Sequence, residues 1–132
     1  MWTPVLKDLH TLPDLELALV FGSFAQGSEQ DHSDLDLAVR YAYPLTSEQK
    51  YHLIDALAVT MARPIDLIDL RRAGVLITHQ AVSKGVKIWG EAEMYAQIAS
   101  RAVIDYADFA PLVERTLKER QRLWMRSSSK VS

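Results

Sequence analysis

The chain has 132 residues, of which 48% are apolar and 24% charged, so it is long enough for one domain with a hydrophobic core and too short for two. It contains no cysteine, which excludes disulfides and thiolate metal sites and is typical of a protein of the reducing cytoplasm. No apolar run approaches the ~20 residues that span a bilayer, and the N-terminal residues lack the pattern of a signal peptide.

The net charge of −2 hides a strong asymmetry along the chain. From Pro111 onward there are six Lys and Arg against two Glu, a net charge of +4, which leaves −6 for residues 1–110. An acidic body of this kind disfavours general binding to nucleic acid. The basic segment is compatible with an acidic partner, with RNA or with a solvated helix face, and its composition does not choose among them.

The N-terminal third predicts a helix, a strand and a turn. Residues 3–10 predict a short helix, and the apolar run 15–21 predicts a central strand with both faces covered. Gly22 ends that strand, residues 24–26 predict a brief helical turn, and residues 28–33 predict a polar loop.

A second strand is predicted over residues 34–40, because polar and apolar side chains alternate at its start. One face receives Asp34, Asp36 and Ala38, and the other receives Leu35, Leu37 and Val39. Thr46 and Gln49 then form a capping box, which opens a helix with apolar residues at helical spacing.

The rest of the chain continues this interleaving of strands and helices. Residues 65–70 predict a strand, 71–84 a helix and 86–89 a short strand. A helical C-terminal extension follows over residues 91–126, in which Pro111 is expected to cause a kink or an interruption.

The resulting fold class is α/β (α+β), a small mixed sheet of about four strands flanked by helices. We expect a single domain over residues 1–132 with its core at about 15–90.

Asp34 and Asp36 are the first candidate metal ligands. Side chains two apart on a strand leave the same face about 6.5–7 Å apart, and two carboxylates held together repel unless a cation lies between them. Mg²⁺ prefers oxygen ligands and takes one or two carboxylates plus substrate phosphates. The alternative is that the pair forms the solvated face of an edge strand.

Gly22 and Ser23 are candidate phosphate-binding residues. A glycine directly after a buried strand lets the backbone approach a ligand, and the start of the following helix offers N–H groups to a phosphate. The hydroxyl of Ser23 can donate to a phosphate oxygen. The alternative is a plain strand-to-helix turn with Ser23 as its N-cap.

Asp66 is a third candidate carboxylate, on a strand whose neighbours are apolar and where burial is costly unless the group is paired or metal-bound. It is alternatively an exposed residue of an edge strand. Asp69 points to the opposite face and is expected to be a cap or a surface group. A phosphate turn with three carboxylates on separate strands predicts a two-metal site for phosphoryl or nucleotidyl transfer.

Gly22-Ser23, ten intervening residues and Asp34-x-Asp36 resemble the signature of the DNA polymerase β-like nucleotidyltransferase superfamily. The small size and the run from Arg63 to Leu70 resemble its minimal nucleotidyltransferase branch, often the antitoxin partner of a HEPN-domain ribonuclease toxin. The resemblance implies that Gly22 and Ser23 hold the triphosphate of ATP.

The same resemblance assigns roles to the carboxylates. Asp34 and Asp36 would hold two Mg²⁺ ions, and Asp66 the catalytic metal and the incoming hydroxyl. His32, Arg71 and Arg72 are close in sequence to the motif, and no role follows for them from the pattern.

The implied function is a cytoplasmic antitoxin that transfers AMP from ATP to a hydroxyl, expected to be a tyrosine, of a cognate HEPN toxin. The alternatives are a non-catalytic antitoxin that masks the toxin, and a nucleotidyltransferase that acts on tRNA or a small molecule. Neither a membrane nor nucleic acid is expected as a direct ligand.

Overall fold

A four-stranded mixed sheet forms the centre of the molecule in this computed structural model, which describes residues 2–27 and 33–131. The order β3-β2-β1-β4 is built from β1 (Leu15–Phe21), β2 (Leu35–Tyr41), β3 (Ile65–Asp69) and β4 (Val86–Trp89). β1 runs antiparallel to β2 and β4, and β2 runs parallel to β3. The predicted fold class is therefore confirmed.

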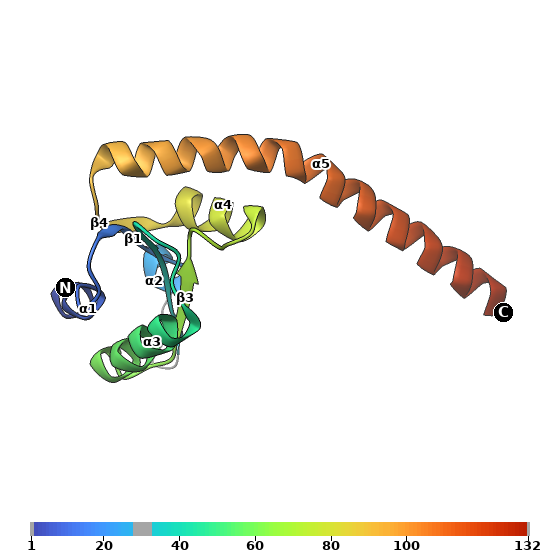
Figure 1. Cartoon of the computed structure of the whole chain (residues 1–132). Helices are drawn as coiled ribbons and strands as arrows, with labels where there is room; N and C mark the ends of the chain where they lie inside the picture. The colour runs from blue at the N-terminus through green and yellow to red at the C-terminus, as the bar shows by residue number, and fades with distance from the viewer. Residues whose placement is uncertain (1, 28–32, 132) are drawn as a thin grey trace.

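Helices cover both faces of the sheet (Figure 1). The helices are α1 (Thr3–Leu9), α2 (Ser23–Gln26), α3 (Ser47–Met61), α4 (Val75–Lys84) and α5 (Ala92–Val131). α1 and α3 pack on the face that carries Leu35, Leu37 and Val39. α4 and α5 pack on the other face, against the β1 residues Leu17, Leu19 and Phe21. The predicted alternation of β2 and the double burial of β1 are confirmed.

The capping box at the start of α3 is present as predicted. The backbone N–H of Gln49 donates to Thr46 Oγ1 at 3.1 Å, and the backbone N–H of Thr46 donates to Gln49 Oε1 at 3.0 Å. These reciprocal bonds satisfy two N–H groups that the helix itself leaves without partners.

The helix after β3 starts later than predicted. Residues 71–73 form a turn in which the N–H groups of Arg72 and Ala73 donate to the carbonyl of Asp69 at 3.0 and 2.9 Å. Gly74 is the N-cap, and α4 begins at Val75. The prediction of a helix from Arg71 was wrong because the capping interactions of Asp69 hold the chain in a turn.

α5 is one continuous helix that contains Pro111 and changes direction near its middle (Figure 1). Of the predicted kink or interruption, the kink is therefore the outcome. Proline removes one backbone hydrogen bond and bends a helix whose other bonds survive. The helix also runs to Val131, beyond the predicted end at residue 126. Within the described part of the chain, no helix is long and apolar enough to cross a membrane.

Candidate active site

Gly22 makes the turn from β1 into α2. Its φ of +71° lies in a region that L side chains rarely adopt, and a Cβ placed on it would lie 2.1 Å from Asp36 Oδ2. The carbonyl of Gly22 accepts a hydrogen bond from Gln26 N–H at 3.2 Å, which closes the turn of α2. Glycine is therefore required at this position by both backbone conformation and space.

Sheet pairing brings the predicted carboxylates together. Asp36 faces Phe21 across the β1–β2 ladder and Asp66 across the parallel β2–β3 ladder. Asp34 precedes the first residue of β2 and is exposed. Gly22, Asp36 and Asp66 thus lie side by side on three adjacent strands or strand ends.

The pKa of Asp36 is raised above its ordinary value by partial burial and, to a lesser degree, by the charge of Asp66, a hydrogen bond with Asp66 and the charge of Asp34. Three acidic groups that compete for protons form a natural site for a cation. Carboxylate oxygens are also the donors that Mg²⁺ prefers. The electrostatics of the cluster therefore fit a divalent ion.

The carboxylates do not form a closed metal cage. Across residues 2–27 and 33–131, no three His, Asp or Glu side chains stand together as a ready-made ligand set. Mg²⁺ commonly keeps only one or two protein carboxylates and completes its shell with water and substrate phosphates. Asp34 and Asp36 therefore fit a Mg²⁺ ion that binds together with a nucleotide, and they fit less well a Mg²⁺ ion that stays bound to the protein alone.

Asp66 is exposed on the edge strand β3. Of the two predicted alternatives, the exposed residue of an edge strand is correct, so there is no burial cost for a metal to offset. Its candidacy rests instead on its register with Asp36.

Asp69, by contrast, is buried with 5% of its surface exposed. Its Oδ2 accepts the backbone N–H of Leu45 at 2.8 Å and its Oδ1 accepts that of Arg71 at 3.0 Å. The expected capping role is correct, and a surface location is not. Asp69 therefore stabilises the fold on the face opposite to Asp66.

Arg71 and Arg72 are held at the far end of the strands from Asp36. Arg71 donates to the carbonyl of Tyr41 at 2.5 Å and to Glu16 at 3.1 Å, and Arg72 donates to the carbonyl of Leu45 at 3.2 Å. These bonds direct both guanidinium groups away from the carboxylate cluster. His32 lies outside the described residues.

Arg63 links the two halves of the motif, a role that the sequence reasoning missed. Its Nη1 donates to the carbonyl of Ser33 at 3.3 Å, and its guanidinium carbon lies 4.6 Å from the centre of the Phe24 ring. It thereby joins α2 to the residue that precedes Asp34. Its position directly before Pro64 and β3 was the available signal.

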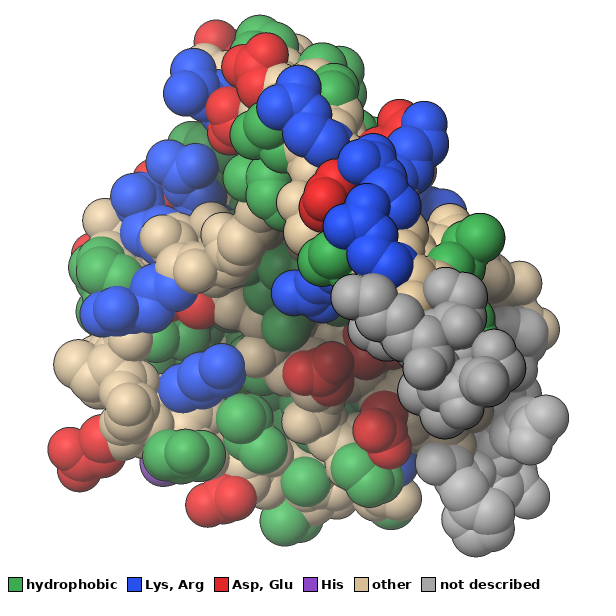
Figure 2. All heavy atoms as spheres, turned by 90° about the vertical axis from the view of Figure 1, so that its right-hand side faces the viewer, with side chains coloured by type: hydrophobic (Ala, Val, Ile, Leu, Met, Phe, Trp, Pro, Cys, Tyr) green, Lys and Arg blue, Asp and Glu red, His purple; other side chains and the backbone are tan. Residues whose placement is uncertain are grey.

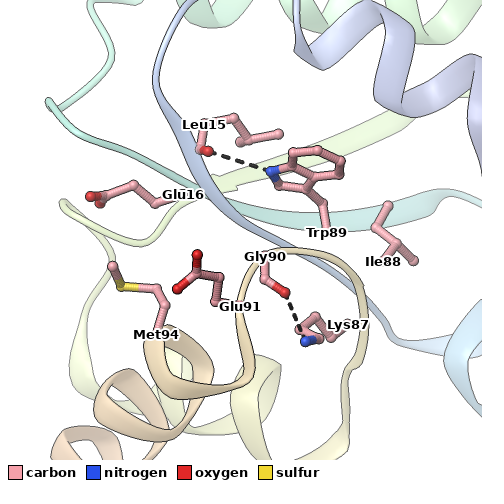
Figure 3. A pocket seen from close by; sticks show the side chains of 8 residues that line it. All are labelled: Leu15, Glu16, Lys87, Ile88, Trp89, Gly90, Glu91 and Met94. Carbon is pink, nitrogen blue, oxygen red and sulfur yellow. Dashed lines mark hydrogen bonds between the residues drawn. The ribbon is translucent and has the colours of Figure 1, made fainter.

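A cavity of about 670 Å³ lies at the other end of β1, between Leu15, β4 and the start of α5 (Figure 3). Two of its polar groups already have partners: Trp89 Nε1 donates to the carbonyl of Leu15 at 3.4 Å, and Lys87 Nζ donates to the carbonyl of Gly90 at 2.7 Å. None of the three candidate carboxylates lines it. We therefore place the candidate chemistry at Asp36 and not in this larger cavity.

The family model described as polymerase beta, nucleotidyltransferase matches residues 5–94, a segment that contains β1 to β4 and all the candidate residues. The chain belongs to this family. The predicted superfamily is thereby confirmed.

Individual proteins similar to this chain include a protein adenylyltransferase and members of toxin–antitoxin complexes. The protein adenylyltransferase MntA of Shewanella oneidensis is 37% identical over 86 residues, which cover 65% of this chain and 60% of MntA. A toxin–antitoxin structure with AMP-PNP has a TM-score of 0.80 and 28% identity, covering 86% of this chain and 96% of that one. A structure of the tri-AMPylated Shewanella oneidensis HEPN toxin in complex with the MNT antitoxin has a TM-score of 0.72 and 26% identity, covering 86% of this chain and 92% of that one.

Proposed function

We propose that this nucleotidyltransferase is a cytoplasmic antitoxin that transfers AMP from ATP to a hydroxyl, expected to be a tyrosine, of a cognate HEPN ribonuclease toxin. The observation that carries the proposal is the placement of Asp36 between Gly22 and Asp66. The names of the similar proteins, a protein adenylyltransferase and an antitoxin bound to an AMPylated HEPN toxin, support the choice of donor and acceptor.

Each candidate residue has a distinct task in this proposal. The turn at Gly22 and Ser23 holds the triphosphate, and Asp34 and Asp36 hold two Mg²⁺ ions. The ions, when bound, neutralise phosphate charge and lower the pKa of the attacking hydroxyl. Asp66 accepts the proton of that hydroxyl as its oxygen bonds to the α-phosphorus and pyrophosphate leaves.

The surroundings of Asp66 favour a protein acceptor over a small molecule. The cavity that Asp66 lines, next to the start of α3, has a volume of about 260 Å³. Pockets for small ligands usually have about 300–1,000 Å³ and enclose most of the ligand. An exposed carboxylate beside a shallow cavity is accessible to a hydroxyl that projects from another protein.

The proposal is tested by incubating the HEPN-domain protein encoded by the neighbouring reading frame with this chain, ATP and Mg²⁺. Intact-mass analysis of the HEPN protein should show AMP-sized increments with the wild type. Asp34→Ala and Asp36→Ala should abolish them, and Asp55→Ala, which removes an exposed carboxylate of α3, should not. Full transfer by the Asp34/Asp36 double variant, or no increment with the wild type, would sink the proposal.

A further inference from the structure

α5 packs on the domain only over its first part. Tyr95 Oη donates to the carbonyl of Val82 in α4 at 2.6 Å, and the ring of Tyr106 stacks on His79 of α4 with centroids 3.9 Å apart. Ile98 and Ala102 are buried against the same helix and sheet. Beyond this contact α5 projects from the domain (Figure 1). The covered part thus shows that this face of α5 packs against a helix.

The apolar face of α5 continues into the projecting part. The residues on it recur at helical spacing, and we call them the distal stripe: Leu112, Val113, Leu117, Leu123 and Trp124. Leu117 is 60% exposed and Trp124 is 70% exposed. A row of large apolar side chains in water is typical of a surface that another protein covers.

The charges of this segment favour an acidic occupant. Arg120 lies within the distal stripe, is exposed and has no hydrogen bond or ion pair with the described residues. On the opposite face, Glu114 pairs with Lys118 and Glu119 with Arg122, each at 3.4 Å. An acidic side chain on a covering helix would therefore complement Arg120.

The net charge of +4 from Pro111 onward also opposes pairing of two copies of α5. Figure 2 shows Lys and Arg side chains gathered where α5 projects toward the viewer, with acidic side chains lower on the same face. A partner with acidic flanks is thus favoured over the pairing of two distal stripes with each other.

The direction of α5 relates this stripe to the candidate active site. α5 begins after β4 at one edge of the sheet and runs across to project beyond the opposite side, where β3 is the edge strand (Figure 1). Asp66 is exposed on β3. A protein held on the distal stripe therefore stands on the side of the sheet where the acceptor hydroxyl is needed.

We propose that the distal stripe binds an acidic amphipathic helix of the acceptor protein and holds that protein beside Asp66; this inference rests on the proposed function for the identity of the acceptor. The stripe acts in docking and takes no part in the chemical step.

The test measures binding of the HEPN-domain protein to the full chain. Leu117→Gln with Trp124→Gln should weaken the Kd at least tenfold, because each substitution removes a large apolar side chain that the partner would bury. Glu114→Gln with Arg122→Gln changes the opposite face without changing the net charge and should leave the Kd unaltered. Arg120→Glu should weaken binding without removing apolar surface. Circular dichroism must show wild-type helix content in every variant.

A second measurement separates this inference from the proposed function. Asp36→Ala should bind the HEPN protein like the wild type while transferring no AMP, whereas the stripe variant should raise the KM for the HEPN protein and keep kcat. Binding without any AMP transfer by the wild type would refute the proposed function and leave the docking inference standing.

Four results would overturn the docking inference. The first three are a wild type that does not bind the HEPN protein, an unchanged Kd for the stripe variant, and tighter binding by Arg120→Glu. The fourth is that substitution of the distal stripe abolishes self-association or RNA binding and leaves binding of the HEPN protein intact.

Discussion

Asp36 occupies the space that a side chain at position 22 would need, since a Cβ on Gly22 would lie 2.1 Å from Asp36 Oδ2. The turn at Gly22 and the strand β2 therefore approach each other closely through the one residue type that has no side chain. A side chain added at position 22 would displace the Asp36 carboxylate.

Gly22→Ala should reduce AMP transfer more than tenfold, because the new methyl group forces the Asp36 carboxylate out of position. Gly27→Ala is a control for positive φ, since Gly27 has nearly the same φ, +70°, and nothing lies within 4 Å of its Cβ. Its ψ of 19° is left-handed helical, whereas the ψ of −148° at Gly22 lies in a region essentially confined to glycine. Both variants should lose stability from backbone strain, on the order of 1–3 kcal/mol with the larger loss at Gly22, measured by urea unfolding. Equal transfer rates in the two variants would contradict the steric role assigned to Gly22.

The raised pKa of Asp36 predicts that its ionisation destabilises the metal-free protein. Because the folded state binds this proton more tightly than the unfolded state, stability falls as pH rises from the ordinary value of 3.8 through the raised value. Asp36→Asn should therefore raise the Tm in EDTA at pH 7. The gain should be a few degrees at most, because Asp36 is only partly buried and solvent screens much of the cost of its charge.

The same measurement at pH 3 should show little difference between Asp36→Asn and wild type, because the Asp36 carboxyl is then mostly protonated and, like the amide that replaces it, uncharged. Mg²⁺ with AMP-PNP should raise the Tm of the wild type more than that of the variant. An Asp36→Asn protein that is less stable than wild type in EDTA at pH 7 would show that the carboxylate cluster is not under repulsion.

The local parts of the fold could be predicted from the sequence because their causes are local. The apolar run of β1, the alternation at the start of β2 and the capping box of Thr46 and Gln49 each depend on residues a few positions apart. The proximity of Gly22 to Asp36 could also be predicted, because both residues belong to one sequence motif. The pairing of Asp36 with Asp66 needed the parallel register of β2 and β3, which no local pattern specifies.

Asp69 and Pro111 show why the remainder could not be predicted. The burial of Asp69 depends on the N–H of Leu45, 24 positions away, and its capping delays the start of α4. For Pro111 the sequence predicted a kink or an interruption, and the helix continues and changes direction. The sequence alone could not decide between the two, because the outcome depends on whether the other hydrogen bonds of the helix survive.

Asp66 and Asp69 should separate activity from stability, although they lie three positions apart on β3. Asp69→Ala leaves the N–H groups of Leu45 and Arg71 without their acceptor and should cost about 2–4 kcal/mol of unfolding free energy. Asp66→Ala removes an exposed side chain and should stay within about 0.5 kcal/mol of wild type while losing AMP transfer. Urea unfolding and intact-mass analysis of the same two proteins make the comparison, and an active, folded Asp69→Ala beside an unfolded Asp66→Ala would reverse the assignment.

Tyr41 should make the fold sensitive to alkali. Its hydroxyl donates to the carbonyl of Leu9 at 2.5 Å and thereby ties β2 to α1, and burial raises the pKa of this phenol. The folded state therefore keeps the proton that the unfolded state releases near pH ~10, so stability falls as pH rises above that value. At pH 7, Tyr41→Phe should have an unfolding free energy about 1 kcal/mol lower than that of wild type, measured by urea unfolding. Between pH 9 and 11, the unfolding free energy of the variant should fall less than that of wild type.

Tyr43→Phe is the control for this prediction. The Tyr43 hydroxyl donates to the carbonyl of Pro13 at 2.8 Å, and the side chain is half-buried. Its removal should therefore change the unfolding free energy at pH 7, and the fall of that free energy between pH 9 and 11, less than removal of the Tyr41 hydroxyl. A Tyr41→Phe protein whose stability falls with alkaline pH as steeply as that of wild type would assign the alkaline transition to groups other than Tyr41.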